Sequence, residues 1–234
     1  MIATYRLSKH LCSFDFYDWL VMVAALGAKE IVFDLSNPRI SWWPHDVMIK
    51  RFYSIMEPGP AFLGLPSRLG HDVGELDMVS RMWEWALAGR TFPRLATVRP
   101  PASKEYTVTI RDSDTHKERD SNRAAWIRFA ETIGAEIIED DRIKPIHLHD
   151  RMALYAGARM NFGVCNGPMH LITLSSYPVT MVVNNAAAAK SQRKKGNVHG
   201  GKFPWMLPNQ RMEWVEDSYD NLCRMFDTIS DRRD

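Results

Sequence analysis

Apolar residues recur along this chain in two different spacings, which together predict strands alternating with helices. Residues 3–7 and 30–35 form the short apolar runs of buried strands, and between them apolar residues recur at helical spacing from Phe16 to Leu26. A strand, a helix and a second strand within about 35 residues have the size of one βαβ unit. Similar patterns in this half predict helices over 46–56 and 76–89 and a third strand over 61–65.

The second half of the chain shows the same alternation more clearly. The spacing predicts strands over 106–110, 135–138, 160–164 and 178–183, and helices over 121–134, over 150–158, from Pro168 onward and from about Tyr219. Residues 184–213 are predicted to form a long loop, and prolines at 93, 100 and 101 mark a linker. Such alternation is typical of parallel sheets. The sequence therefore predicts an α/β fold of two Rossmann-like halves, residues 1–100 and 105–234, with parallel sheets that face a cleft.

Composition narrows the class of protein. Hydrophobic residues make up 45% and charged residues 25% of the 234, which is typical of a globular chain. The formal net charge of +2 gives no global attraction to nucleic acid or to an anionic membrane, although local basic patches remain. The three cysteines are widely spaced, which favours reduced thiols and a cytoplasmic protein over a disulfide framework. The longest apolar stretch, residues 19–28, is too short to span a bilayer.

The strongest local signal for a binding site is the segment from Val164 to His170. A buried strand ends there, Asn166 and Gly167 form a tight turn, and Pro168 falls in the first helical turn. Free backbone N–H groups at a helix start suit a phosphate or a carboxylate, and ligands of open α/β sheets bind at the carboxyl ends of strands. The alternative is a simple turn between a strand and a helix.

A second signal follows the first strand of the second half. Arg111 lies at the carboxyl end of that strand, and Arg119 and Asn122 lie just before the next helix. Guanidinium groups bind phosphate oxygens in a bidentate way, so two arginines beside the glycine turn can hold a diphosphate. The alternative is a solvated charged loop.

Two further segments carry candidate residues. The predicted loop 184–211 contains Lys190 and Trp205 among cations, glycines and aromatics, and we interpret it as a lid over a nucleotide, as a contact to a nucleic-acid backbone, or as a plain surface loop. Asp15 lies at the first strand-to-helix turn, where it either caps the helix or serves as a general base.

Several common signatures are absent from the sequence, including G-x-G-x-x-G, Walker A, G-x-S-x-G and H-E-x-x-H. The segments 111–122, 150–158, 163–170 and 176–178 nevertheless resemble the nucleotide-sugar half of GT-B glycosyltransferases, in particular heptosyltransferase-like and fucosyltransferase-like members. The resemblance implies two Rossmann-like domains in a minimal GT-B arrangement. It also implies that the donor diphosphate sits on a Gly-Pro helix start, beside a basic residue that follows the first strand, and that no metal is needed.

The resulting hypothesis is a glycosyltransferase that moves a sugar from a nucleotide-diphosphate donor to an unknown acceptor, with no cofactor besides that donor. Arg111 and Arg119 neutralise the leaving diphosphate, the turn donates backbone hydrogen bonds, and Asp15 is the base. The residues expected to contact the donor are Arg111, Arg119, Asn122, Asn166, Gly167, Pro168, Met169, His170, Lys190 and Trp205. The alternatives are a non-catalytic module that binds a sugar nucleotide or, less favoured, a nucleic acid, and a sugar-nucleotide epimerase of the same fold.

Overall fold

The computed structural model describes residues 1–10, 12–36, 38, 44–71, 82–98, 104–113, 116–139, 145–194 and 201–230. The chain forms two compact units. The first contains Met1–Val98, Asp140–Ala153 and Leu174–Ser176, and the second contains Arg99–Glu139, Leu154–Thr173 and Tyr177–Asp234. The sequence predicted two halves, each formed by one continuous stretch and separated at 100–105. In the structure the chain returns to the first unit twice, at Asp140–Ala153 and at Leu174–Ser176.

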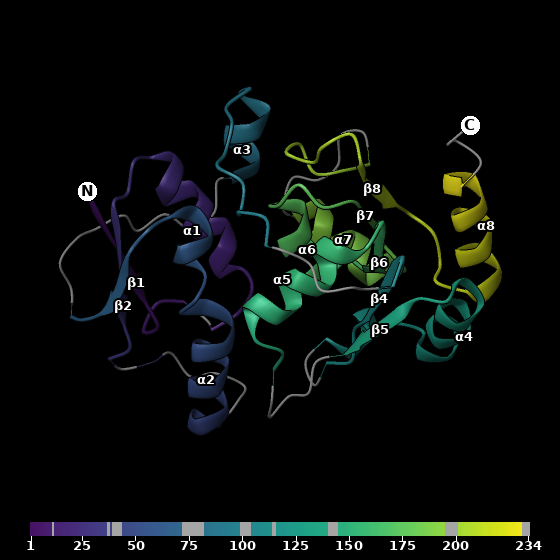
Figure 1. Cartoon of the computed structure of the whole chain (residues 1–234), viewed down its shortest axis with the longest axis horizontal. Coiled ribbons are helices and arrows are strands. Elements are labelled where there is room, and N and C mark those ends of the chain that lie inside the picture. Colours follow the sequence, from purple (N-terminus) through teal and green to yellow (C-terminus); the bar gives the residue numbers. More distant parts are fainter. Residues whose placement is uncertain are drawn as a thin grey trace. The chain divides into compact units, whose positions relative to one another are not determined.

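The first unit is built on a three-stranded parallel sheet with the order β1-β2-β3. Thr4 pairs with Val32 and Val32 with Arg68, so all three strands end at the same edge. The elements are β1 (Ile2–Arg6), α1 (Phe16–Ala25), β2 (Glu30–Asp34), α2 (His45–Arg51), a π-helical turn (Phe52–Met56), a 3-10 helix (Pro60–Leu63), β3 (Ser67–Leu69) and α3 (Met82–Leu87) (Figure 1).

Aromatic side chains fill the core of the first unit. Phe16 on α1 lies 5.0 Å from the ring of Tyr5 on β1 and 5.5 Å from that of Phe33 on β2. Phe33 contacts Phe52 edge to face at 5.0 Å, and the Tyr17 hydroxyl donates to the carbonyl of Ile55. Because α1 and the π-helical turn are anchored to the sheet by these rings, the segments after β1 and β2 leave from fixed positions.

The second unit contains a five-stranded parallel sheet with the order β5-β4-β6-β7-β8. Numbered within the sheet this is 2-1-3-4-5, a doubly wound order that differs from the 3-2-1-4-5-6 of the six-stranded dinucleotide-binding sheet. The elements are β4 (Tyr106–Ile110), a 3-10 turn (Lys117–Arg119), α4 (Arg123–Ile133), β5 (Glu136–Glu139), α5 (Leu148–Gly157), β6 (Met160–Val164), α6 (Gly167–Thr173), β7 (Val179–Val182), α7 (Ala186–Lys194), β8 (Gln210–Glu213) and α8 (Tyr219–Ser230). The division between the two units runs through α5.

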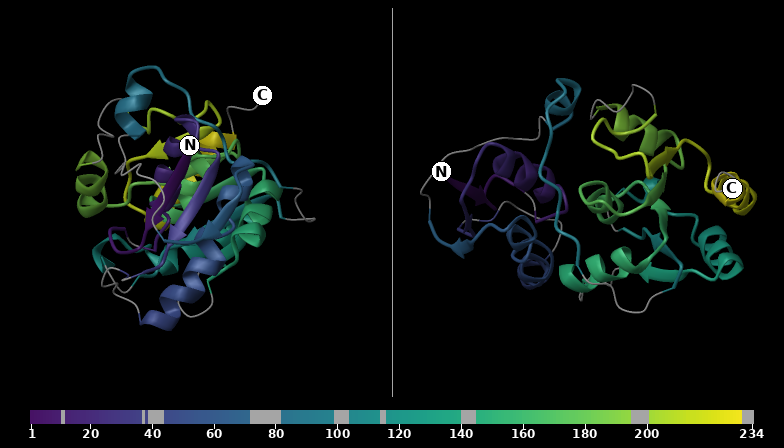
Figure 2. Two further views of the ribbon diagram at one scale, coloured as in Figure 1. Left: turned by 90° about the vertical axis from the view of Figure 1, so that its left-hand side faces the viewer. Right: turned by 45° about the horizontal axis from the view of Figure 1, so that its top comes forward.

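Helices cover both faces of this second sheet. Figures 1 and 2 show α4 and α8 side by side on one face and α6 and α7 on the other. On the first face Trp126 and Phe129 of α4 pack with Phe162 of β6 and Leu222 of α8 in one buried cluster. The mixed α/β class with parallel sheets is therefore confirmed.

Two predictions of secondary structure are wrong. Residues 61–65 do not form a strand, because Pro60 opens a 3-10 turn and Gly64 ends it at φ 66°, in the left-handed region that favours glycine. Residues 184–213 are not one long loop, because they contain α7 and β8. Trp42 and Trp43 and the first part of the predicted helix at 76–89 lie outside the described residues. No helix within the described ranges is long and apolar enough to cross a membrane.

Candidate functional site

The carboxyl edge of the five-stranded sheet is where the polar residues of the second unit gather. The chain leaves β4 for β5 on one side of it and later places β6 on the other side, which makes the boundary between β4 and β6 the topological switch point. Open α/β sheets bind ligands in the crevice at such a point, because the loops that leave the two strands diverge there. Here those loops begin at Arg111 and at Cys165.

Arg111 and Arg119 lie close together in the loop after β4. Burial lowers the pKa of Arg111, and the positive charge of Arg119 lowers it further, while Asp120, Glu118 and Cys165 act in the opposite direction. Arg111 Nε is 3.1 Å from Asp120 Oδ1, and both side chains are less than a fifth exposed. Two neighbouring guanidinium groups, partly removed from water, repel each other, and a bound anion relieves that repulsion.

Hydrogen bonds within the loop fix this pair. The Arg111 backbone N–H donates to Ser121 Oγ at 2.9 Å, and the Ser121 N–H donates back to the Arg111 carbonyl at 3.0 Å. The Ser113 N–H donates to Asp120 Oδ2 at 3.1 Å. Burial raises the pKa of Asp120, and these contacts only partly offset that effect. The described residues at the two ends of the loop after β4 are therefore joined by hydrogen bonds, while Asp112 and residues 116–118 are exposed.

The turn after β6 is largely self-capped. The Met169 N–H donates to Asn166 Oδ1 at 2.9 Å, and the His170 N–H donates to the Asn166 carbonyl at 2.9 Å. Pro168 has no N–H, so within 167–170 only the Gly167 amide has no acceptor among the described residues. The turn lies where the sequence predicted, yet it offers far fewer backbone donors than expected. Asn166 is a typical N-cap, which explains the difference.

Met169 and His170 both point into the protein. Met169 is fully buried, and a Cβ on Gly163 would lie 2.9 Å from its sulfur and 2.8 Å from the Thr109 carbonyl oxygen, so the residue before Val164 must be glycine. His170 is buried edge-on against the rings of Phe203 and Trp205, at 5.2 and 5.6 Å. These side chains pack α6 onto the unit and are removed from solvent.

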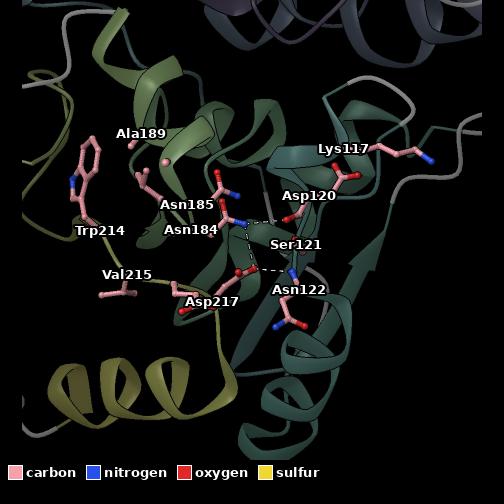
Figure 3. Close-up of a pocket in the computed structure, with 13 residues that line it drawn as sticks. Lys117, Asp120, Ser121, Asn122, Asn184, Asn185, Ala189, Trp214, Val215 and Asp217 are labelled. Carbon is pink, nitrogen blue, oxygen red and sulfur yellow. Dashed lines mark hydrogen bonds between the residues drawn. The ribbon is translucent and has the colours of Figure 1, made fainter.

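A hollow of about 720 Å³ lies beside the arginine pair. It is bounded by the end of the loop after β4, by the start of α7 and by the segment that follows β8 (Figure 3). Figure 3 shows Lys117 and Trp214 at opposite ends of the group that lines it. The lining residues are Lys117, Asp120, Ser121, Asn122, Val183, Asn184, Asn185, Ala186, Ala189, Trp214, Val215, Glu216 and Asp217.

Asp217 connects the walls of the hollow. Its buried carboxylate accepts from the Asn122 N–H at 2.7 Å, from Trp126 Nε1 at 2.8 Å and from Asn184 Nδ2 at 3.4 Å (Figure 3). Asn184 Nδ2 also donates to the Asp120 carbonyl at 2.9 Å, and Asn185 Nδ2 donates to the Glu118 carbonyl at 2.8 Å. Through these bonds the segments after β4, β7 and β8 hold one another in place.

Of the predicted donor contacts, Asn122 alone lines the hollow, and it also caps α4, with its Oδ1 3.4 Å from the Ala125 N–H. Lys190 is exposed on α7 and does not line the hollow. Trp205 is buried, stacks on Phe203 at 4.6 Å and donates from Nε1 to Thr173 Oγ1 at 3.1 Å, so its ring is occupied by packing. A stacking role for Trp205 does not fit this geometry.

Asp15 belongs to the first unit. It immediately precedes α1, where its side chain makes no capping hydrogen bond, and it is exposed. Burial raises the pKa of Tyr5 well above its ordinary value, and the nearby charge of Asp15 raises it further. The capping role considered for Asp15 is therefore not observed.

Sequence reasoning missed every lining residue of the hollow except Asn122, among them Asn184, Asn185, Trp214 and Asp217. A usable signal existed for the two asparagines, which directly follow a buried strand, as Asn166 does. Asn185 caps α7 by accepting from the Ala188 N–H at 2.9 Å. Trp214 and Asp217 follow β8, a strand that the sequence did not predict, so no signal pointed to them.

A second polar group lies at the carboxyl edge of the first sheet. Asp34 Oδ1 accepts from the Ser36 N–H at 2.9 Å and from Ser36 Oγ at 2.5 Å, and it lies 3.7 Å from Nδ1 of the exposed His71. Burial acts to raise the pKa of Asp34, but the bonds from Ser36 and the charges of His71 and Arg6 outweigh it and lower that pKa. Within the described ranges no three His, Cys, Asp or Glu side chains are grouped to hold a metal ion.

Comparisons of this chain with protein-family models, with curated proteins and with solved structures find no match. The features that bear on function are therefore the two arginines after β4, the hollow beside them and the strand order of the five-stranded sheet.

Proposed function

We propose that the second unit binds a nucleoside diphosphate at the carboxyl edge of its sheet, and that the chain is a glycosyltransferase with a nucleotide-sugar donor. The observation that carries the proposal is that Arg111 and Arg119 both lie in the loop that leaves β4 at the topological switch point, near enough for the charge of Arg119 to lower the pKa of Arg111. Two partly desolvated guanidinium groups match the charge and the oxygen geometry of a diphosphate. The GT-B arrangement of two Rossmann-like halves is part of this proposal.

In the proposed transfer, an acceptor hydroxyl oxygen attacks the anomeric carbon of the donor sugar. The bond from that carbon to the phosphate oxygen breaks, and the diphosphate leaves with the bonding electron pair. Arg111 and Arg119 stabilise the charge that develops on the leaving oxygen. The proton of the acceptor hydroxyl passes to a base, for which the sequence offers Asp15.

The remaining donor contacts are fewer than the sequence suggested. The amide of Gly167 is available to an oxygen of the ligand, and Asn122 and Asn166 stabilise the helix starts beside the arginines. Met169, His170 and Trp205 support α6 from within. The site is therefore mainly a side-chain site and depends little on backbone amides.

A thermal-shift screen followed by a transfer assay tests the proposal. A ligand at a hundred times its dissociation constant stabilises a fold by about 2.7 kcal/mol. We expect UDP or GDP, together with the corresponding sugar nucleotide, to raise the midpoint of unfolding, and the sugar nucleotide to be consumed when an acceptor is present. Binding without any turnover over a panel of acceptors and water would favour the non-catalytic module. No shift with any nucleoside diphosphate would contradict the proposal.

A further inference from the structure

The arginine pair and the neighbouring hollow share one residue, Asp120. Its carboxylate is 3.1 Å from Arg111 Nε, and it also lines the hollow. A diphosphate held by the arginines therefore brings one of its substituents to the mouth of the hollow.

The charges that line the hollow oppose a phosphate. Lys117 is the one cation among the lining residues, against the carboxylates of Asp120, Glu216 and Asp217. Asp217 Oδ2 already accepts from three donors, but Glu216 is exposed and Asp120 is partly exposed. Like charges repel at short range, so the hollow favours a neutral group that can donate hydrogen bonds to carboxylates.

The floor of the hollow carries an additional acceptor. Asn184 is only 4% exposed, and its Nδ2 is used by Asp120 and Asp217. Its Oδ1 accepts from no residue that the structure describes. A buried acceptor without a donor costs free energy, and a ligand hydroxyl group that reaches it satisfies it.

One wall of the hollow is aromatic. Trp214 is half-buried, and its Nε1 donates to the Gly201 carbonyl at 2.7 Å, which fixes the ring. Gly201 adopts φ 77°, in the left-handed region that favours glycine, so the backbone that accepts this bond depends on glycine. A fixed aromatic face beside acceptor oxygens matches a ring that is apolar on its face and hydroxylated at its edge.

We propose that the hollow receives a neutral sugar ring with adjacent hydroxyl groups, while the diphosphate stays on Arg111 and Arg119. This inference rests on the proposed function and names the part of the donor that the hollow takes. The ring is either the ribose of the nucleotide or the sugar that is transferred. Both present the same diol chemistry, and the test below separates them.

The test is calorimetric titration of the full chain with inorganic pyrophosphate, UDP, GDP, UDP-glucose and GDP-mannose. Trp214→Leu should weaken binding of the ring-bearing ligands about tenfold, which corresponds to about 1.4 kcal/mol, and leave pyrophosphate unchanged. An effect already present with UDP or GDP assigns the hollow to ribose. An effect confined to the sugar nucleotides assigns it to the transferred sugar.

Two controls keep the result interpretable. Trp85→Leu changes a half-buried tryptophan of the first unit whose Nε1 also donates to a carbonyl, and it should leave every affinity unchanged. Trp214→Phe retains an aromatic face and should retain most of the affinity. Binding that depends on Arg111 but not on Trp214 would overturn this inference and leave the proposed function standing. Absence of binding to the wild-type chain would overturn both.

Discussion

Asp217 is the residue on which the geometry of the candidate site most depends. A buried carboxylate is stable only where donors surround it, and Asp217 has a backbone donor at the start of α4, an indole donor from the core and an amide donor from Asn184. The same three bonds join the segments after β4, β7 and β8. Its role is to position the loop that carries Arg111 and Arg119.

Replacing Asp217 should therefore be costly. Asp217→Ala leaves the indole N–H of Trp126 and the amide of Asn122 without an acceptor in a buried place, and we expect the free energy of unfolding to fall by roughly 2–4 kcal/mol. Urea denaturation measures this loss of unfolding free energy. Asp227→Ala, on the exposed side of α8, is the matched control and should change that free energy by less than about 0.5 kcal/mol. Equal free energies of unfolding for the two variants would show that the hydrogen bonds of Asp217 do not stabilise the fold.

Asp34 and Ser36 give a prediction for pH. The folded state holds the pKa of Asp34 below its ordinary value of 3.8, so the bonds from Ser36 stabilise the fold above that value and lose their effect as the pH falls below it. Ser36→Ala should be less stable than wild type at pH 6.5, and the difference should shrink towards pH 3. Denaturation with urea at several pH values measures this difference. A difference that stays constant with pH would rule out the ionised Asp34 as its source.

At the scale of helices and strands, the sequence predicted elements with strong apolar periodicity and missed those without it. The strands β4, β6 and β7 were predicted because they are short runs rich in apolar and β-branched residues, and they are buried. β8 was missed because its inward residue Gln210 is polar, and it is satisfied by carbonyls of Ile172 and Tyr177 at 3.1 Å. α7 was missed because alanines supply helix propensity without an apolar stripe.

The helix start at Asn166 can be tested as an element. Asn166→Ala removes the acceptor of the Met169 N–H and should lower the free energy of unfolding by about 1 kcal/mol, the usual contribution of an N-cap. Asn166→Ser keeps a capping oxygen and should recover most of that loss in the same denaturation experiment. If both variants match wild type, the cap does not stabilise α6.

At the scale of the whole chain, strand order decides which loops meet. The sequence placed Arg111 and Asn166 each after a strand, and parallel strands end at one edge, so their common location was predictable. The order within the sheet was not predictable, because it depends on long-range pairings that local patterns do not encode. In that order β6 and β7 separate β8 from β4, and the segment after β8 brings Trp214 and Asp217 to the end of the loop after β4.

Binding of a nucleoside diphosphate at the arginine pair is the central claim, and calorimetric titration of Arg111→Ala with UDP and GDP tests it most directly. Loss of hydrogen bonds to a charged ligand costs about 1.5–3 kcal/mol, so we predict a dissociation constant about 10- to 100-fold higher than wild type. Arg123→Ala, an exposed arginine on α4 that pairs with Glu139, should bind as wild type does. Equal affinities of Arg111→Ala and wild type, or no binding by wild type, would contradict the account.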